Sequence, residues 1–110
     1  MEIAKLADTI RPVAEQEGLR LVVLFGSEAR GDARAEADLD LAVDAGRPGD
    51  AVALTNRLSV ALGHPDVDLA DLRRADPVLL RAVAEEGIPV YEGESGAFVS
   101  FQSLAVRRFY

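Results

Sequence analysis

Two strand-like segments lie in the first half of the chain, separated by a polar segment that contains glycine. Residues 19–25 (LRLVVLF) form an almost continuous apolar run between two glycines, which is typical of a buried strand. Residues 38–44 (DLDLAVD) alternate acidic and apolar side chains with a period of two, and Leu39, Leu41 and Val43 form the apolar face. A chain built on such segments needs further elements to cover the sheet that they form.

Helical and strand patterns alternate along the rest of the chain. Apolar residues at spacings of three and four indicate helices, and an Asp-Pro start before residue 77 is a strong beginning for one of them. Pro12 falls inside the first helical pattern, so that helix should kink or restart there. The alternation predicts an α/β layer fold with helices covering a small sheet. Helices are expected from residues 3, 51, 77 and 98, and further strands at about 66–69 and 88–91.

Composition excludes several classes of protein. A length of 110 residues suits one domain, here residues 1–110. The net charge of −7 disfavours a nucleic-acid binder, and the absence of cysteine excludes disulfides and thiolate metal sites. No apolar run reaches the ~20 residues that span a bilayer, so we expect no membrane partner. The first residues lack the basic start and apolar stretch of a signal peptide, which predicts a cytoplasmic protein.

The chemistry of the chain is concentrated where the two strand segments meet. Gly26 allows a ligand to approach the backbone, and Ser27 can cap the following turn or helix, whose free amides suit phosphate oxygens. Asp38 and Asp40 are two residues apart on one strand, so both should project from the same face, ~6–7 Å apart. Carboxylates so placed can hold a pair of divalent cations that clamp a phosphoryl group. The pattern predicts nucleotidyl transfer.

A third carboxylate should come from the segment HPDVDLADL. Asp66 and Asp68 share one face there, and the central position of Asp68 makes it our choice as metal ligand and proton acceptor. Asp66 remains the alternative. His64 lies in a turn and is expected to be structural.

Other polar and aromatic residues have more ordinary interpretations. Arg30 is the cation nearest to the predicted phosphate site, but it could equally be a surface residue paired with Glu28 or Asp32. Arg73, Arg74 and Arg81 suit a solvated, ion-paired face. The aromatic residues near the end of the chain suit either core packing or an interface with a partner. They are Phe98, Phe101, Phe109 and Tyr110.

Taken together, these motifs resemble the minimal nucleotidyltransferase (MNT) family, which is related to DNA polymerase beta. The resemblance rests on Gly26-Ser27, on Ala29-Arg30-Gly31, and on Asp38-Leu39-Asp40-Leu41, and it extends over most of the chain from Leu19. It implies a mixed sheet of about four strands, and nucleotide contacts from Gly26, Ser27, Arg30 and Gly31. The family has Ser before the first aspartate, where this chain has Ala37.

The resemblance also implies substrates and partners. The donor would be a nucleoside triphosphate, ATP, used with two Mg²⁺ ions. Family members of this length are often antitoxins that move AMP onto a tyrosine hydroxyl of a HEPN ribonuclease toxin, so the chain would form a hetero-oligomer with that toxin or a homodimer. An alternative is a weakly active or inactive module that neutralises its toxin by binding, since Ala37 lacks a hydroxyl. A third is transfer to a small hydroxylic molecule.

Overall fold

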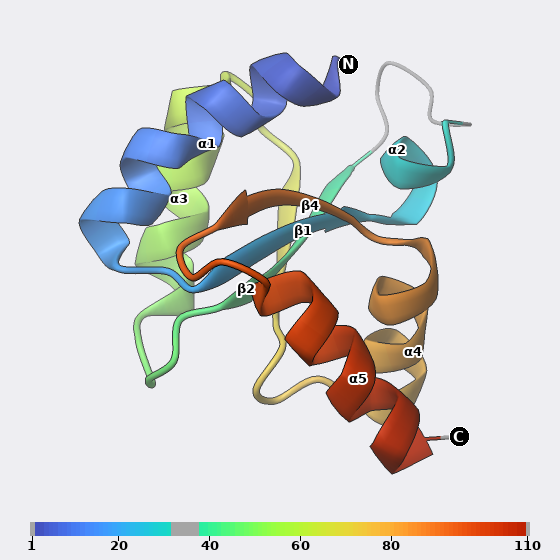
Figure 1. Cartoon of the computed structure of the whole chain (residues 1–110). Coiled ribbons are helices and arrows are strands. Elements are labelled where there is room, and N and C mark those ends of the chain that lie inside the picture. Colours follow the sequence, from blue (N-terminus) through green and yellow to red (C-terminus); the bar gives the residue numbers. More distant parts are fainter. Residues whose placement is uncertain (1, 32–37, 110) are drawn as a thin grey trace.

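The computed structural model describes residues 2–31 and 38–109 and places helices on both faces of one sheet (Figure 1). Ala37 lies outside the described residues. The α/β prediction is confirmed, because helices and strands alternate along the described chain as the sequence indicates. The elements are α1 (Ile3–Glu17), β1 (Leu21–Phe25), α2 (Gly26–Arg30), β2 (Leu39–Asp44), α3 (Ala51–Leu62), β3 (Val67–Asp71), α4 (Pro77–Glu86), β4 (Ile88–Glu92) and α5 (Ala97–Phe109).

The sheet is mixed, with the strand order β3-β2-β1-β4. β1 pairs antiparallel with both β2 and β4, whereas β2 and β3 run parallel. As a result, the end of β1 and the beginnings of the other three strands meet at one end of the sheet. Phe25 pairs with Asp40 there, and Asp40 in turn pairs with Asp68.

Each face of the sheet has its own apolar core. Leu39, Leu41 and Val43 pack with α1 and α3, as the period-two pattern predicted. Ala42 and Val23 lie in the second core, with residues of α4 and α5. Figure 1 shows these two pairs of helices on opposite sides of the sheet. Asp40 is two residues from Ala42 on the same strand, so its side chain lies on the α4 and α5 face.

Several predicted boundaries were wrong, and the hydrogen bonds explain the first of them. The strand predicted from Leu19 begins at Leu21, because the Leu19 amide donates to the Ala14 carbonyl and ends α1. β3 extends past the predicted Leu69 to Asp71, since its pairing with β2 continues to the end of that strand. β4 likewise reaches Glu92 rather than residue 91.

The predicted caps behave as expected at α3 and α4. The Asp76 side chain accepts a hydrogen bond from the Leu79 amide, and Pro77 occupies the first turn of α4. Gly63 ends α3 in the left-handed conformation. No helix in the described part of the chain has both the length and the apolar character to cross a membrane.

Pro12 lies inside α1, which continues as one helix through it, so of the two predicted outcomes, a kink or a restart, the restart is wrong. A proline inside a helix lacks one backbone donor and crowds the preceding turn, while it also restricts the unfolded chain. We therefore expect Pro12→Ala to raise the free energy of unfolding by about 1–2 kcal/mol. Pro77→Ala is the control and should give no gain, because a first-turn proline needs no donor. Urea denaturation of both variants measures the difference, and equal effects would contradict this account.

Candidate active site

Two of the predicted carboxylates face each other across adjacent strands. Asp40 of β2 and Asp68 of β3 are direct partners in the parallel register, and partners in a sheet project to the same face. Asp40 is half-buried, while Asp68 is exposed. The sheet thus places one carboxylate from each strand at the end where β1 stops and β2 begins.

The other two aspartates lie just outside the strands. Asp38 immediately precedes β2 and is exposed. Asp66 precedes β3, and its backbone carbonyl accepts a hydrogen bond of 2.8 Å from the Leu39 amide. Asp66 therefore helps to begin the β2–β3 pairing through its main chain, whereas Asp68 lies within the ladder beside Asp40.

The environment of Asp40 disfavours its charged form. Burial raises the pKa of the Asp40 carboxyl, and the negative charges of Asp68 and Asp38 raise it further, while Arg30 acts in the opposite direction. Asp68 and Asp38 therefore both repel the ionised form of Asp40. A bound cation would stabilise the ionised carboxylates, because its positive charge offsets both the desolvation cost of Asp40 and the repulsion between the negative charges.

Gly26 lies against the carboxylate of Asp40. A Cβ added at Gly26 would clash with Oδ2 of Asp40 and lie 3.1 Å from its Cγ, and the glycine has φ +74°. Within the protein itself, Asp40 closely approaches Gly26, and the approach of a ligand to this glycine stays a prediction. Only glycine suits both the backbone conformation and the space.

Ser27 and Gly31 lie in and after the short helix α2. Ser27 does not cap α2, as the sequence suggested it could, because the helix already begins at Gly26 and no side chain caps its start. Gly31 ends the helix in the left-handed conformation, with its amide directed to the carbonyls of Glu28 and Ser27. No residue of α2 is fully buried, but the partly buried Ala29 packs against the core that includes α1 and α3.

Arg30 forms an ion pair that neither sequence interpretation included. Its Nη1 lies 3.5 Å from Oε2 of Glu86, the last residue of α4, and both side chains are about half exposed. Sequence reasoning missed Glu86 because it lies far from Arg30 along the chain and carries no motif. The only sequence signal was an acidic pair, Glu85-Glu86, directly before Gly87 at the end of a predicted helix.

The other residues considered in the sequence analysis make contacts that support the fold. His64 accepts a hydrogen bond at Nδ1 from the Asp66 amide, which fits the expected turn role. Arg81 pairs with Glu85 on its own helix. Phe98 is buried and stacks with Phe101, with ring centroids 6.3 Å apart, so these two aromatic residues belong to the core. The Phe109 side chain and Tyr110 lie outside the described part of the chain.

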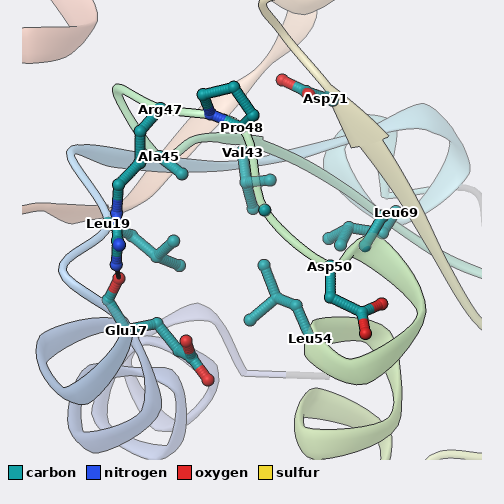
Figure 2. Close-up of a pocket in the computed structure, with 12 residues that line it drawn as sticks. Glu17, Leu19, Val43, Ala45, Arg47, Pro48, Asp50, Leu54, Leu69 and Asp71 are labelled. Atoms are coloured by element: carbon teal, nitrogen blue, oxygen red, sulfur yellow. Dashed lines mark hydrogen bonds between the residues drawn. The ribbon is translucent and has the colours of Figure 1, made fainter.

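A pocket of about 320 Å³ lies at the opposite end of the sheet (Figure 2). Leu19, Val43, Leu54 and Leu69 contribute its apolar lining. The charged residues around it already support the fold: Arg47 donates to the Glu17 carbonyl, and Asp50 caps α3. None of the predicted site residues lines this pocket.

The carboxylate oxygen atoms at the end of the sheet where β2 and β3 begin are ligands of the type that a hard divalent cation prefers. Mg²⁺ takes oxygen ligands and is commonly held through one or two carboxylates together with substrate phosphates. Asp40 and Asp68 supply such a pair on adjacent strands. Within residues 2–31 and 38–109, no three acidic or histidine side chains lie close enough to hold an ion as they stand. A third protein ligand would have to turn toward the ion.

Comparison with known proteins assigns the family. The family described as "Polymerase beta, Nucleotidyltransferase" matches residues 8–95, a range that includes Gly26, Asp38, Asp40 and Asp68. The chain belongs to this nucleotidyltransferase family. The resemblance drawn from the sequence motifs is thereby confirmed.

Individual relatives agree with the family in sequence and in fold. Protein adenylyltransferase MntA of Shewanella oneidensis is 42% identical over 72 residues, which are 63% of this chain and 51% of that protein. The nucleotidyltransferase described here thus spans about half the length of this curated relative. A toxin–antitoxin crystal structure with AMP-PNP matches with a TM-score of 0.79 and 29% identity, covering 92% of this chain and 84% of that one.

A second similar solved structure contains an AMPylated toxin. It is described as a tri-AMPylated Shewanella oneidensis HEPN toxin in complex with MNT antitoxin. The match has a TM-score of 0.74 and 28% identity, over 96% of this chain and 85% of that chain. These matches confirm the mixed α/β fold of the nucleotidyltransferase.

Proposed function

We propose that this nucleotidyltransferase moves AMP from ATP onto a hydroxyl group of a HEPN ribonuclease toxin and thereby acts as its antitoxin. The observation that carries the proposal is the pairing of Asp40 with Asp68 beside Gly26, three residues within the range that the family matches. Support comes from the two relatives with a nucleotide analogue or an AMPylated toxin. We propose tyrosine as the acceptor and the cytoplasm as the location.

The reaction is a displacement at the α-phosphorus of ATP. The acceptor hydroxyl oxygen forms a bond to that phosphorus, the bond to the β-phosphate oxygen breaks, and pyrophosphate leaves. The hydroxyl proton passes to a carboxylate, for which we propose Asp68 because it is exposed and therefore open to an acceptor. Asp38, Asp40 and Asp68 would hold two Mg²⁺ ions, which neutralise charge on the attacking and leaving oxygens when bound.

The residues on the other side of Asp40 would contact the nucleotide. Gly26 and Ser27 begin α2 without a side-chain cap, which leaves their amides available to phosphate oxygens. Arg30 would place its guanidinium toward the triphosphate, and Gly31 would keep the end of α2 clear of side-chain atoms. The net charge of −7 would attract a ribonuclease with a basic RNA-binding face, which favours a complex with the toxin.

A direct test incubates the protein with ATP, Mg²⁺ and a purified HEPN ribonuclease, and determines the intact masses of both chains. We expect the ribonuclease to gain one or more AMP units, and Asp68→Asn to reduce the initial rate by about 100-fold or more. Asp66→Asn is the matched control and should retain the rate, because its carboxylate is assigned no role. Equal losses in the two variants would contradict Asp68 as the third carboxylate.

Failure of the wild-type protein to modify the ribonuclease would contradict enzymatic transfer. Inhibition of the ribonuclease by a stable complex, without any mass gain, would then support neutralisation by binding. Transfer of AMP to a small hydroxylic molecule, but not to the protein, would contradict the proposed acceptor.

A further inference from the structure

We propose that His64 is a positioning residue that fixes the start of the β2–β3 pairing and thereby the carboxylates of the site. These carboxylates belong to Asp38, Asp40 and Asp68. The inference rests on the proposed function, because that function assigns the metal ions to them. His64 is assigned no contact with substrate; it acts through the main chain of Asp66.

The backbone of His64 is held by the end of α3. Its amide donates a hydrogen bond of 3.1 Å to the Ser59 carbonyl, directly after Gly63 ends the helix in the left-handed conformation. α3 is anchored by Leu58, which is fully buried in the core that α1 and α3 share with the sheet. The side chain of His64 therefore extends from a well-supported point of the fold.

Two hydrogen bonds connect the His64 ring to the first residue of β2. Nδ1 of His64 accepts from the Asp66 amide at 3.2 Å, and the Asp66 carbonyl accepts from the Leu39 amide at 2.8 Å. A neutral imidazole can accept at Nδ1 when its proton is on Nε2. Because the amide and the carbonyl belong to the same residue, the ring restricts the backbone rotations that direct this carbonyl toward Leu39.

The hydrogen bond to Leu39 lies where the strand pairing reaches the carboxylates. The Leu39 amide is part of the peptide bond that joins this residue to Asp38, so the hydrogen bond also orients the backbone of Asp38. Leu39 pairs with Val67, and the next pair in the register is Asp40 with Asp68. Loss of the first hydrogen bond would loosen this end of the ladder and let the carboxylates move apart.

Two substitutions separate the acceptor of His64 from its bulk. His64→Leu keeps an apolar side chain of useful size but has no acceptor, whereas His64→Asn offers Oδ1 close to the position of Nδ1. Amide hydrogen exchange, followed by NMR, is the first readout. We expect the Leu39 amide, relative to the Leu41 amide further along β2, to exchange about three- to tenfold faster in His64→Leu. The ratio in His64→Asn should match that of the wild type.

Asp50→Ala is the matched control for a general loss of stability. It also removes a hydrogen bond from a side chain to a backbone amide, since Asp50 caps the start of α3. Asp50 lines the pocket at the opposite end of the sheet, so the exchange ratio should not change. An unchanged ratio in His64→Leu would overturn the proposal. Equal increases in His64→Leu and either of the other two variants would also overturn it.

Mn²⁺ binding without nucleotide is the second readout, because free Mn²⁺ has a distinct electron paramagnetic resonance signal. His64→Leu should bind Mn²⁺ about three- to tenfold more weakly than the wild type, the factor that one hydrogen bond supplies. His64→Asn and Asp50→Ala should bind it like the wild type. Wild-type affinity in His64→Leu would contradict the link from this side chain to the carboxylates.

Kinetics then test the consequence for the reaction. In His64→Leu, kcat for AMP transfer should fall about tenfold, with the KM for the ribonuclease within about twofold of the wild type. A raised KM with an unchanged kcat would contradict positioning by His64. If the wild type itself transfers no AMP, the proposed function fails, while hydrogen exchange and Mn²⁺ binding still decide the role of His64.

Discussion

Asp40→Asn is expected to abolish AMP transfer and, at the same time, to make the protein without nucleotide more stable. The carboxylate of Asp40 is half-buried and close to two further negative charges, so its ionised form costs free energy in the folded state. Asparagine has nearly the same shape and no charge. The free energy of unfolding at neutral pH should rise by about 0.5–2 kcal/mol, the usual range for a stabilising substitution. The transfer rate should fall by about 1,000-fold or more.

The pH dependence of the stability gain is a second readout of the same substitution. The folded pKa of Asp40 is raised above its ordinary value of 3.8. Stability from the protonated form is therefore present below the unfolded pKa and is lost as the pH rises through the folded pKa. The advantage of Asp40→Asn should be small near pH ~3 and full at pH ~7. Thermal denaturation over this range measures it, and a variant less stable than the wild type at neutral pH would contradict the electrostatic account.

Gly26→Ala is expected to damage both stability and activity, because the new methyl group would meet the carboxylate of Asp40. Position 26 also has φ +74°, a conformation that residues with a Cβ adopt at a cost. We expect a loss of about 2–4 kcal/mol in the free energy of unfolding, from backbone strain and displacement of Asp40 together. The transfer rate should fall by about 100-fold, since a displacement of about 1 Å is enough for such a loss.

Gly63→Ala is the matched control for this substitution. Gly63 has φ +62°, but an added Cβ there has no atom within 4 Å among those described. The free energy of unfolding of Gly63→Ala should fall by about 1–2 kcal/mol, which is the cost of the backbone conformation alone, and the variant should retain the transfer rate. Chemical denaturation and initial rates of both variants give the comparison. If the two alanine variants lose the same stability and both remain active, the contact between Gly26 and Asp40 has no functional importance.

Much of the fold could be predicted because local patterns and tertiary packing agree. The alternation of apolar and acidic residues in β2 places Leu39, Leu41 and Val43 in one core, and the tertiary structure leaves them there. The Asp-Pro start of α4 forms its cap locally, because the Asp76 side chain accepts a hydrogen bond from the amide of Leu79, only three residues further along the chain. Boundaries were harder to predict, since Leu19 is apolar enough for a strand but is used to end α1.

The candidate site, too, could be predicted only in part from the sequence. Gly26, Asp38, Asp40 and Asp68 could be selected from the sequence, because glycine and carboxylates carry a recognisable chemistry at strand ends. Which aspartate faces Asp40 depends on the parallel register of β2 and β3, and a shift of one residue would move the paired side chain to the other face. Register is set by long-range pairing, which a single sequence does not display.

The sequence by itself determined most of the helices and strands, their buried faces and the residue types available for phosphoryl chemistry, because these depend on neighbours within a few positions. The short helix α2 was not among the predicted elements. Only the tertiary structure decided that Asp68 lies opposite Asp40, that the Asp40 carboxylate rests on Gly26, and that Glu86 reaches Arg30. Each of these contacts joins segments far apart in the chain. Their geometry depends on how the helices and strands pack together, and local propensity carries no record of that packing.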